Sequence, residues 1–143
     1  MQITRQADYA LRAMLYLAQL EPSQRAATSQ IADEQHIPPS FLAKIISQLS
    51  IAGLIHTSRG ARGGVSLARQ PEEITILEVV EAIDGPISLN ECTHSTGSCP
   101  FGETCPLRSL WCETQAEMVA RLRSTTFAQF VPEQAGALPS AAD

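Results

Sequence analysis

The sequence predicts a mainly α-helical fold with one small β-hairpin, followed by a cysteine loop and a long C-terminal helix. Apolar residues recur at intervals of three and four in several segments, which is the period of an amphipathic helix. A glycine-rich turn after residue 58 separates two short segments of β-forming residues. All four cysteines fall within residues 92–112 of the 143-residue chain, and its 44% hydrophobic residues suffice for one modest core.

The first three predicted helices follow one another closely. Thr4 is the expected cap of the first helix, and Thr28 is the expected cap of the second. Pro38 interrupts the second helix, whereas Pro39 suits the first turn of a third, where its missing N–H does no harm. One apolar stripe runs along the third helix and leaves its other faces polar. The stripe consists of Leu42, Ile45, Ile46 and Leu49.

A β-hairpin is predicted directly after the third helix. Residues 54–58 and 65–69 are the expected strands, and Arg59 and Arg62 lie in the turn between them. Two short helices joined by a tight turn describe a helix-turn-helix, although any small three-helix bundle shares that pattern. The hairpin could also be merely solvent-exposed, with glycines that only form its turn. Its position after the third helix favours a winged helix-turn-helix domain that binds double-stranded DNA.

The distribution of charge agrees with a nucleic-acid partner for the first half of the chain. The net charge is −5, yet residues 1–70 carry seven Lys/Arg against four Asp/Glu, whereas residues 71–143 carry three against eleven. We expect the helix at 40–50 to enter the major groove and the two wing arginines to contact the backbone or the minor groove. The side chains expected nearest the DNA are Ser40, Phe41, Lys44, Arg59 and Arg62.

Two further helices are predicted in the second half. Thr75 and Glu78 match a capping box and begin a fourth helix, and Pro106 opens a longer fifth one. The apolar stripe of the fifth helix is not easily buried by one chain, which predicts packing against a second copy in a homodimer. The expected organisation is therefore a winged helix-turn-helix domain at 1–84, a cluster-binding loop at 85–105, a dimerisation helix at 106–131 and a disordered tail at 132–143.

The cysteine loop is the expected site of a bound inorganic group. Cys92, Cys99, Cys105 and Cys112 are spaced C-x6-C-x5-C-x6-C, with few apolar residues to order the first two gaps. Disulfides suit secreted domains, but the chain opens with a polar helix and shows no signal peptide. Zinc sites usually contain closely spaced cysteine pairs, which are missing here. The wider spacing favours an iron–sulfur cluster held by reduced cysteines in the cytoplasm.

Other chemistry finds little support in the sequence. No Ser/His/Asp, H-E-x-x-H or nucleotide-loop motif accompanies the cysteines, so we do not expect an enzyme. No apolar run approaches the roughly 18 residues of a membrane span. Asp8 and Arg12 lie one turn apart on the polar side of the first helix, where an ordinary surface ion pair and a functional role for Asp8 both remain open.

Several motifs together support a family resemblance. ITRQADYALRAMLYLA, IPPSFLAKIISQLSIAGLI, SRGARGGVSLAR, EEITILEVVEAIDG and the cysteine loop leading into CPLRSLW occur in this order. In order and spacing they closely resemble the winged-helix iron–sulfur repressors typified by IscR and NsrR. The resemblance covers roughly residues 1–130. It implies a homodimeric bacterial transcription regulator whose long C-terminal helices cross at the dimer interface, with a cluster held near them.

The resemblance also implies a ligand set. Cys92, Cys99 and Cys105 match the three family cysteines, although the first gap is one residue longer than usual. The histidine ligand of the IscR-like branch is replaced by Arg108, whereas Asp8 occupies the place of the aspartate that the other subunit supplies in the nitric-oxide-sensing NsrR-like branch. A 4Fe-4S cluster is favoured over a 2Fe-2S cluster. Cys112 fits neither branch and is a further candidate ligand, a substitute for a loop cysteine, or an inert thiol.

The predicted function is therefore a DNA-binding repressor whose affinity for DNA is controlled by an iron–sulfur cluster that senses nitric oxide, redox state or iron. The alternative is an iron-free, thiol-based or zinc-containing regulator of the same fold.

Overall fold

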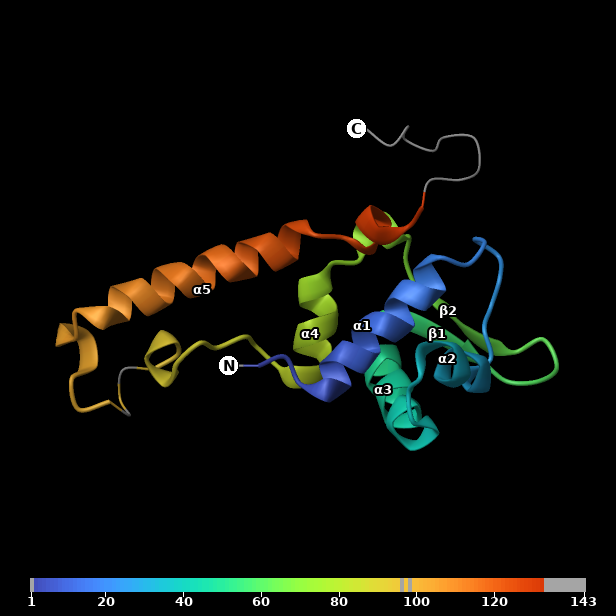
Figure 1. The fold of residues 1–143 in the computed structure, drawn as a ribbon, viewed down its shortest axis with the longest axis horizontal. Helices are drawn as coiled ribbons and strands as arrows, with labels where there is room; N and C mark the ends of the chain where they lie inside the picture. Colours follow the sequence, from blue (N-terminus) through green and yellow to red (C-terminus); the bar gives the residue numbers. More distant parts are fainter. Residues whose placement is uncertain (1, 96, 98, 133–143) are drawn as a thin grey trace.

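The computed structural model describes residues 2–95, 97 and 99–132. The tail predicted to be disordered thus lies, except for Pro132, outside the described residues. Four helices and a β-hairpin form the body of the molecule, and a fifth helix projects from it (Figure 1). In chain order these elements are α1 (Arg5–Ala18), α2 (Thr28–Gln35), α3 (Pro39–Ile51), β1 (Ile55–Ser58), β2 (Gly64–Leu67), α4 (Ile76–Asp84) and α5 (Leu107–Ser124).

Helix α1 lies at the centre of the body and contacts α2, α3, α4 and β2. Its small inner residues Ala10 and Ala13 are fully buried, which lets the neighbouring helices approach closely. The apolar stripe predicted for α3 is confirmed, since all four of its residues are buried against α1 and its neighbours. Burying each of these large aliphatic side chains stabilises the fold by about 1.5–3 kcal/mol. The predicted mainly α-helical fold with a winged helix-turn-helix is confirmed.

Hydrogen bonds at the helix starts connect elements of the body. Thr4 caps α1 as predicted, because its hydroxyl oxygen accepts the N–H of Ala7 at 3.1 Å. The same hydroxyl donates to the Asp84 carboxylate at 2.5 Å, so the start of α1 is joined to the end of α4. The prediction for Thr28 is wrong: it lies inside α2, and Ala27, which cannot cap with a side chain, takes the N-cap position. Pro39 opens α3 as predicted.

The wing is an antiparallel hairpin in which Ile55 lies opposite Leu67. Its strands are shorter than the predicted 54–58 and 65–69. Ala26, from the loop before α2, pairs with Val65 through two backbone hydrogen bonds of 2.8 and 3.0 Å. This pairing brings the loop so close to the hairpin that a Cβ on Gly64 would lie 2.8 Å from the Ala26 carbonyl oxygen.

Gly64→Ala is expected to destabilise the fold by roughly 1–3 kcal/mol, because its φ of +148° disfavours a side chain and the Ala26 carbonyl blocks one. Urea unfolding of both variants against wild type measures the cost. Gly60→Ala is the matched control, since Gly60 also has a positive φ (+102°) but has no obstacle within 4 Å. Equal losses of stability in the two variants would mean that the close approach of Ala26 contributes nothing.

Helix α4 begins with the predicted capping box. The Thr75 hydroxyl accepts the Glu78 N–H at 3.1 Å, and the Glu78 carboxylate accepts the Thr75 N–H at 2.9 Å. Glu78 also pairs with Arg69 at 2.8 Å. Partial burial acts to raise the pKa of Glu78, but the Thr75 N–H and the Arg69 guanidinium outweigh it and leave the pKa below its usual value. These contacts tie α4 to the segment that follows the wing.

The long helix differs from its prediction over 106–131, because α5 ends at Ser124 and residues Phe127–Phe130 form a separate 3-10 helix, η4. Burial explains the break, since Phe127 is only 2% exposed and enters the same core as α1. The Thr125 carbonyl accepts the N–H of Ile76, the first residue of α4, at 2.9 Å, and the Phe127 N–H donates to the Ile74 carbonyl at 3.1 Å. The chain therefore leaves the body after α4 and returns to it through α5 (Figure 1).

Candidate DNA-binding surface and cysteine site

The outer face of α3 presents three of the side chains predicted to contact DNA. Ser40, Phe41 and Lys44 are all exposed near the start of the helix. Phe41 also has a partner within the fold, because its ring meets that of Tyr9 on α1 edge to face, with centroids 6.1 Å apart. It remains 42% exposed. Phe41 therefore connects α1 to the exposed side of α3.

The wing carries the other two predicted DNA contacts. Arg59 and Arg62 are exposed in the turn between β1 and β2. The structure adds Arg25, which lies beside the hairpin and donates a hydrogen bond to the hydroxyl of Ser58. Arg25 was not among the predicted contacts, since only the pairing of its neighbour Ala26 with β2 brings it to the wing. Three cations are thus available near one edge of the domain, where DNA phosphates could be neutralised.

Asp8 lies on α1, where its carboxylate forms an ion pair with Arg12 at 2.7 Å. Both side chains are about half exposed, so the pair itself adds little stability. The Arg12 guanidinium also lies 5.7 Å from the centre of the Tyr9 ring. Because Tyr9 contacts Phe41, a continuous series of contacts runs from Asp8 to α3.

An open pocket surrounds Asp8. Arg12 and Tyr9 form part of its lining, and so does His36, which caps α2 in a left-handed conformation. Only the tertiary fold brings His36, which follows α2, to the same pocket as Asp8 on α1. The complete lining is Gln2, Ile3, Thr4, Arg5, Asp8, Tyr9, Arg12 and His36.

The cysteine segment extends away from the winged helix-turn-helix, alongside α5 and towards its far end (Figure 1). Cys92 lies in a short 3-10 helix, η2 (Glu91–Thr93), and Cys105 follows another, η3 (Gly102–Thr104). All four cysteines are free thiols and half-buried. Among residues 2–95, 97 and 99–132, no three His, Cys, Asp or Glu side chains are gathered as a metal-binding group. The predicted ligands are therefore not preassembled within one chain.

Helix α5 holds the start of the cysteine segment through its inner face. Arg108, the residue at the place of the histidine ligand, donates to the Cys92 carbonyl at 3.4 Å. About two turns further along the same face, the Gln115 side-chain oxygen accepts the Leu89 N–H at 2.9 Å. Cys112 lies between these two residues on the same face and is half-buried.

The outer side of α5 lacks such cover. None of the 18 residues of this helix is fully buried, and Leu107 and Leu110 are 56% and 50% exposed. The C-terminal half differs, since Met118, Val119 and Leu122 pack against the buried side chains of α4. This half of the stripe thus has a partial cover within its own chain, although none of its residues is fully buried, as expected of a stripe that one chain does not easily bury. Among the described residues, the N-terminal half leaves an exposed apolar surface.

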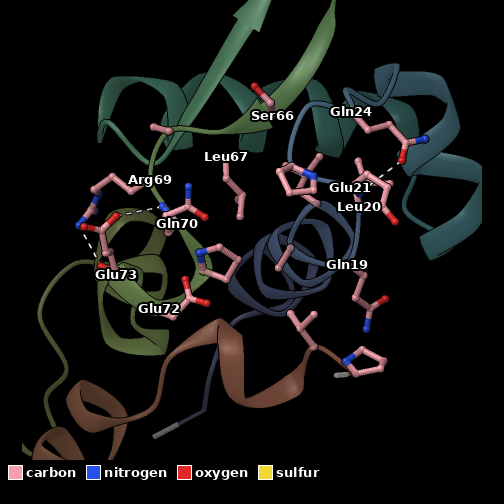
Figure 2. Close-up of a pocket in the computed structure, with 17 residues that line it drawn as sticks. Gln19, Leu20, Glu21, Gln24, Ser66, Leu67, Arg69, Gln70, Glu72 and Glu73 are labelled. Atoms are coloured by element: carbon pink, nitrogen blue, oxygen red, sulfur yellow. Dashed lines mark hydrogen bonds between the residues drawn. The ribbon is translucent and has the colours of Figure 1, made fainter. Parts of the chain in front are cut away.

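A second pocket lies between the end of α1, the base of the wing and η4 (Figure 2). Its polar lining is already engaged in local hydrogen bonds: Arg69 donates to the Glu73 carbonyl at 3.1 Å, and the Glu73 carboxylate accepts the Gln70 N–H at 3.1 Å. It contains none of the predicted site residues. No helix in the described part of the chain is long and apolar enough to span a membrane.

A helix-turn-helix whose second helix exposes polar residues, followed by a hairpin with arginines at its tip, defines a winged-helix DNA-binding transcription regulator. The model of the Rrf2 family, described as iron-dependent transcriptional regulators, matches residues 3–133. The chain belongs to this family.

Known relatives and solved structures agree with that assignment. The transcriptional regulator NsrR of Shouchella clausii is 37% identical over 133 residues, which cover 92% of this chain and 89% of the relative. The structure of CymR, described as the global cysteine regulator of B. subtilis, matches with a TM-score of 0.79 and 28% identity over 91% of this chain and 95% of that one. IscR of T. potens matches with a TM-score of 0.73 and 25% identity, covering 91% and 85%.

Proposed function

We propose that this protein is a homodimeric repressor in the cytoplasm whose affinity for DNA is controlled by an iron–sulfur cluster sensing nitric oxide, redox state or iron. The observation that carries the proposal is the pairing of a thiol-rich segment with an accessible carboxylate on a different part of the fold. Cys92, Cys99 and Cys105 are free and half-buried, and Asp8 borders an open pocket. The family description as iron-dependent regulators supports it.

The donor set fits the proposed group. Three thiolates and one carboxylate are ligands that iron accepts in such clusters, and a 4Fe-4S cluster takes four. Cys92, Cys99 and Cys105 would hold it, with Asp8 of the second copy as the fourth ligand. The loop has few apolar residues of its own, so ligand binding would supply the free energy that closes it. When bound, the cluster would supply reactivity towards nitric oxide and oxidants.

The side chains around Asp8 explain how ligation would reach the DNA-binding surface. Asp8 has one carboxylate, which Arg12 engages at 2.7 Å when no metal competes for it. Ligation would draw Asp8 away from Arg12 and free that guanidinium from its pair. Arg12 lies against Tyr9, and Tyr9 lies against Phe41 on α3. Two side-chain conformations of Arg12 would therefore favour two positions of α3 relative to α1. Ligation would then shift the population from one position to the other.

The proposal predicts that Asp8→Ala will lower cluster content and alter its response to nitric oxide. Iron and acid-labile sulfide are counted, and absorption spectra recorded, on protein purified without oxygen before and after nitric oxide addition. About four irons per chain that bleach with nitric oxide are expected for wild type. Asp33→Ala is the matched control, since Asp33 is an exposed acid on α2 outside the Asp8 pocket. An Asp8→Ala protein with unchanged iron and unchanged response would rule out this ligand scheme.

Mixed dimers test whether Asp8 acts on the other copy. One chain carries Asp8→Ala and the other carries Cys105→Ala, so ligation across the dimer leaves one complete site. The expected result is about half of the wild-type iron with a wild-type spectrum. Ligation within one chain would leave no complete site and no wild-type spectrum.

An iron-free regulator of the same fold is the competing function. It rests on the four free thiols and on the similarity to a structure described as a cysteine regulator. A protein that stays colourless after anaerobic purification and cluster reconstitution would favour this alternative, and bound zinc would then distinguish its zinc-containing form from its thiol-based form.

A further inference from the structure

The segment that carries Cys92 is held by two hydrogen bonds on the face of α5 that carries Cys112. Arg108 and Gln115 lie one helical turn before and after Cys112 on one face of α5. Arg108 donates to the carbonyl of Cys92, and Gln115 accepts the N–H of Leu89. The segment therefore runs antiparallel to α5, because the earlier helix residue bonds the later segment residue and the later helix residue bonds the earlier one. Cys112 is therefore level with the residues between Leu89 and Cys92.

The helix geometry allows a covalent link at this point. Four residues of α-helix rise about 6 Å, so Cys112 lies within about one turn of the residue that bonds Cys92. A disulfide spans Cα atoms roughly 4.4–6.8 Å apart, so Cys92 would reach Cys112 by moving along α5 by no more than about one turn. Both thiols are free and half-buried. The four cysteines are consequently unequal. The side chains of Arg108 and Gln115 hold the Cys92 segment on the face that carries Cys112, whereas the Arg108 N–H holds the Cys105 carbonyl at the start of α5, about two turns from Cys112.

We propose that Cys92 and Cys112 form an intramolecular disulfide when a hydroperoxide oxidises the cluster-free protein. One thiolate attacks the peroxide oxygen, becomes a sulfenic acid and releases hydroxide, or an alkoxide from an organic peroxide. The second thiolate attacks the sulfenic sulfur, the S–S bond forms and hydroxide leaves. Two thiols lose two electrons in total, the peroxide is reduced by two electrons, and the released hydroxide ions take up protons.

The disulfide has a definite structural consequence. It would fix the segment from Leu89 to Cys92 on the inner face of α5, where Arg108 and Gln115 already hold it. It would also remove Cys92 from the proposed ligand set until a reductant restores the thiol. The inference goes beyond cluster sensing and does not depend on it, since both thiols are present in protein that contains no iron.

The test compares two full-length variants with equal numbers of thiols. Cys99→Ser with Cys105→Ser keeps Cys92 and Cys112, whereas Cys92→Ser with Cys105→Ser keeps Cys99 and Cys112. Each apoprotein receives one equivalent of hydrogen peroxide, and free thiols are counted over time by alkylation and intact mass. The first variant is expected to lose both thiols as a disulfide within one chain, about tenfold faster than the second.

Three results would overturn the proposal: equal rates in the two variants, a disulfide that joins two chains on a non-reducing gel, or a Cys112 that stays reduced. Peptide mapping of oxidised wild type should in addition yield the 92–112 link as the main product. Failure of cluster sensing is distinguishable, because a protein that takes up no iron can still form this disulfide. Conversely, a protein that binds the predicted cluster but shows no such link would retain the proposed function alone.

Discussion

Replacing Leu107 and Leu110 with glutamate is expected to convert a dimer into a monomer. These two side chains are half or more exposed on the outer side of the N-terminal half of α5. Burying a leucine stabilises an interface by about 1.5–3 kcal/mol, so losing two in each copy should weaken dimerisation by at least a hundredfold. Sedimentation equilibrium over a range of protein concentrations measures the dissociation constant. Affinity for a palindromic duplex should fall with it, since one chain then contacts only one half-site.

Ile51→Glu provides the matched control for that experiment. Ile51 is 86% exposed at the end of α3, so the substitution places a glutamate, one against the two of the α5 variant, at an exposed apolar site away from α5. It should leave the dissociation constant unchanged. Circular dichroism establishes that both variants remain folded. An unchanged dissociation constant in the α5 variant would place the dimer interface elsewhere.

Removing both wing arginines is expected to weaken DNA binding by about 10- to 100-fold at moderate salt. Arg59 and Arg62 are exposed at the tip of the wing, and each phosphate contact contributes nearly one unit to the slope of log affinity against log salt. The double alanine variant should therefore lower that slope by about two. Fluorescence anisotropy measures it on a duplex selected by the wild-type protein.

Arg121→Ala with Arg123→Ala controls for the loss of two positive charges. Both arginines lie in the last turn of α5, outside the wing and the outer face of α3. The control should keep the wild-type salt dependence. If it loses as much affinity as the wing variant, the effect belongs to the net charge, and the wing makes no direct contact with DNA.

Local patterns predicted most of the fold because each element carries its own signals. The cap at Thr4, the proline at the start of α3 and the Thr75 capping box act over three or four residues, and the structure confirms all three. Thr28 was misassigned because the chain enters the helix one residue earlier than its side chain indicates. The end of α5 was missed for a different reason: Phe127 continues the helical period, but its burial against α1 is a tertiary effect.

The candidate site could be predicted only in part. Residue types and spacing identified the thiols and the wing arginines, but they could not indicate that Asp8 shares a pocket with His36. Nor could they show that Arg25 reaches the wing, because a β-bridge between distant segments brings it there. Cys112 illustrates the same limit, since its position relative to Cys92 depends on two hydrogen bonds between α5 and the preceding segment.

The burial of Phe127 in η4 fixes the C-terminal end of α5 to the body, so the helix can rotate about that end. An 18-residue helix is about 27 Å long, so a shift of roughly 2 Å at the cysteine end rotates it by only about 4° at the pivot. A displacement of the cysteine segment would thus cause only a small rotation where α5 joins the body of its own chain. Asp8 has no such reduction, since only Arg12 and Tyr9 separate it from Phe41. In the proposed function, a change at Asp8 on α1 would therefore reach α3 more directly than a movement transmitted along α5.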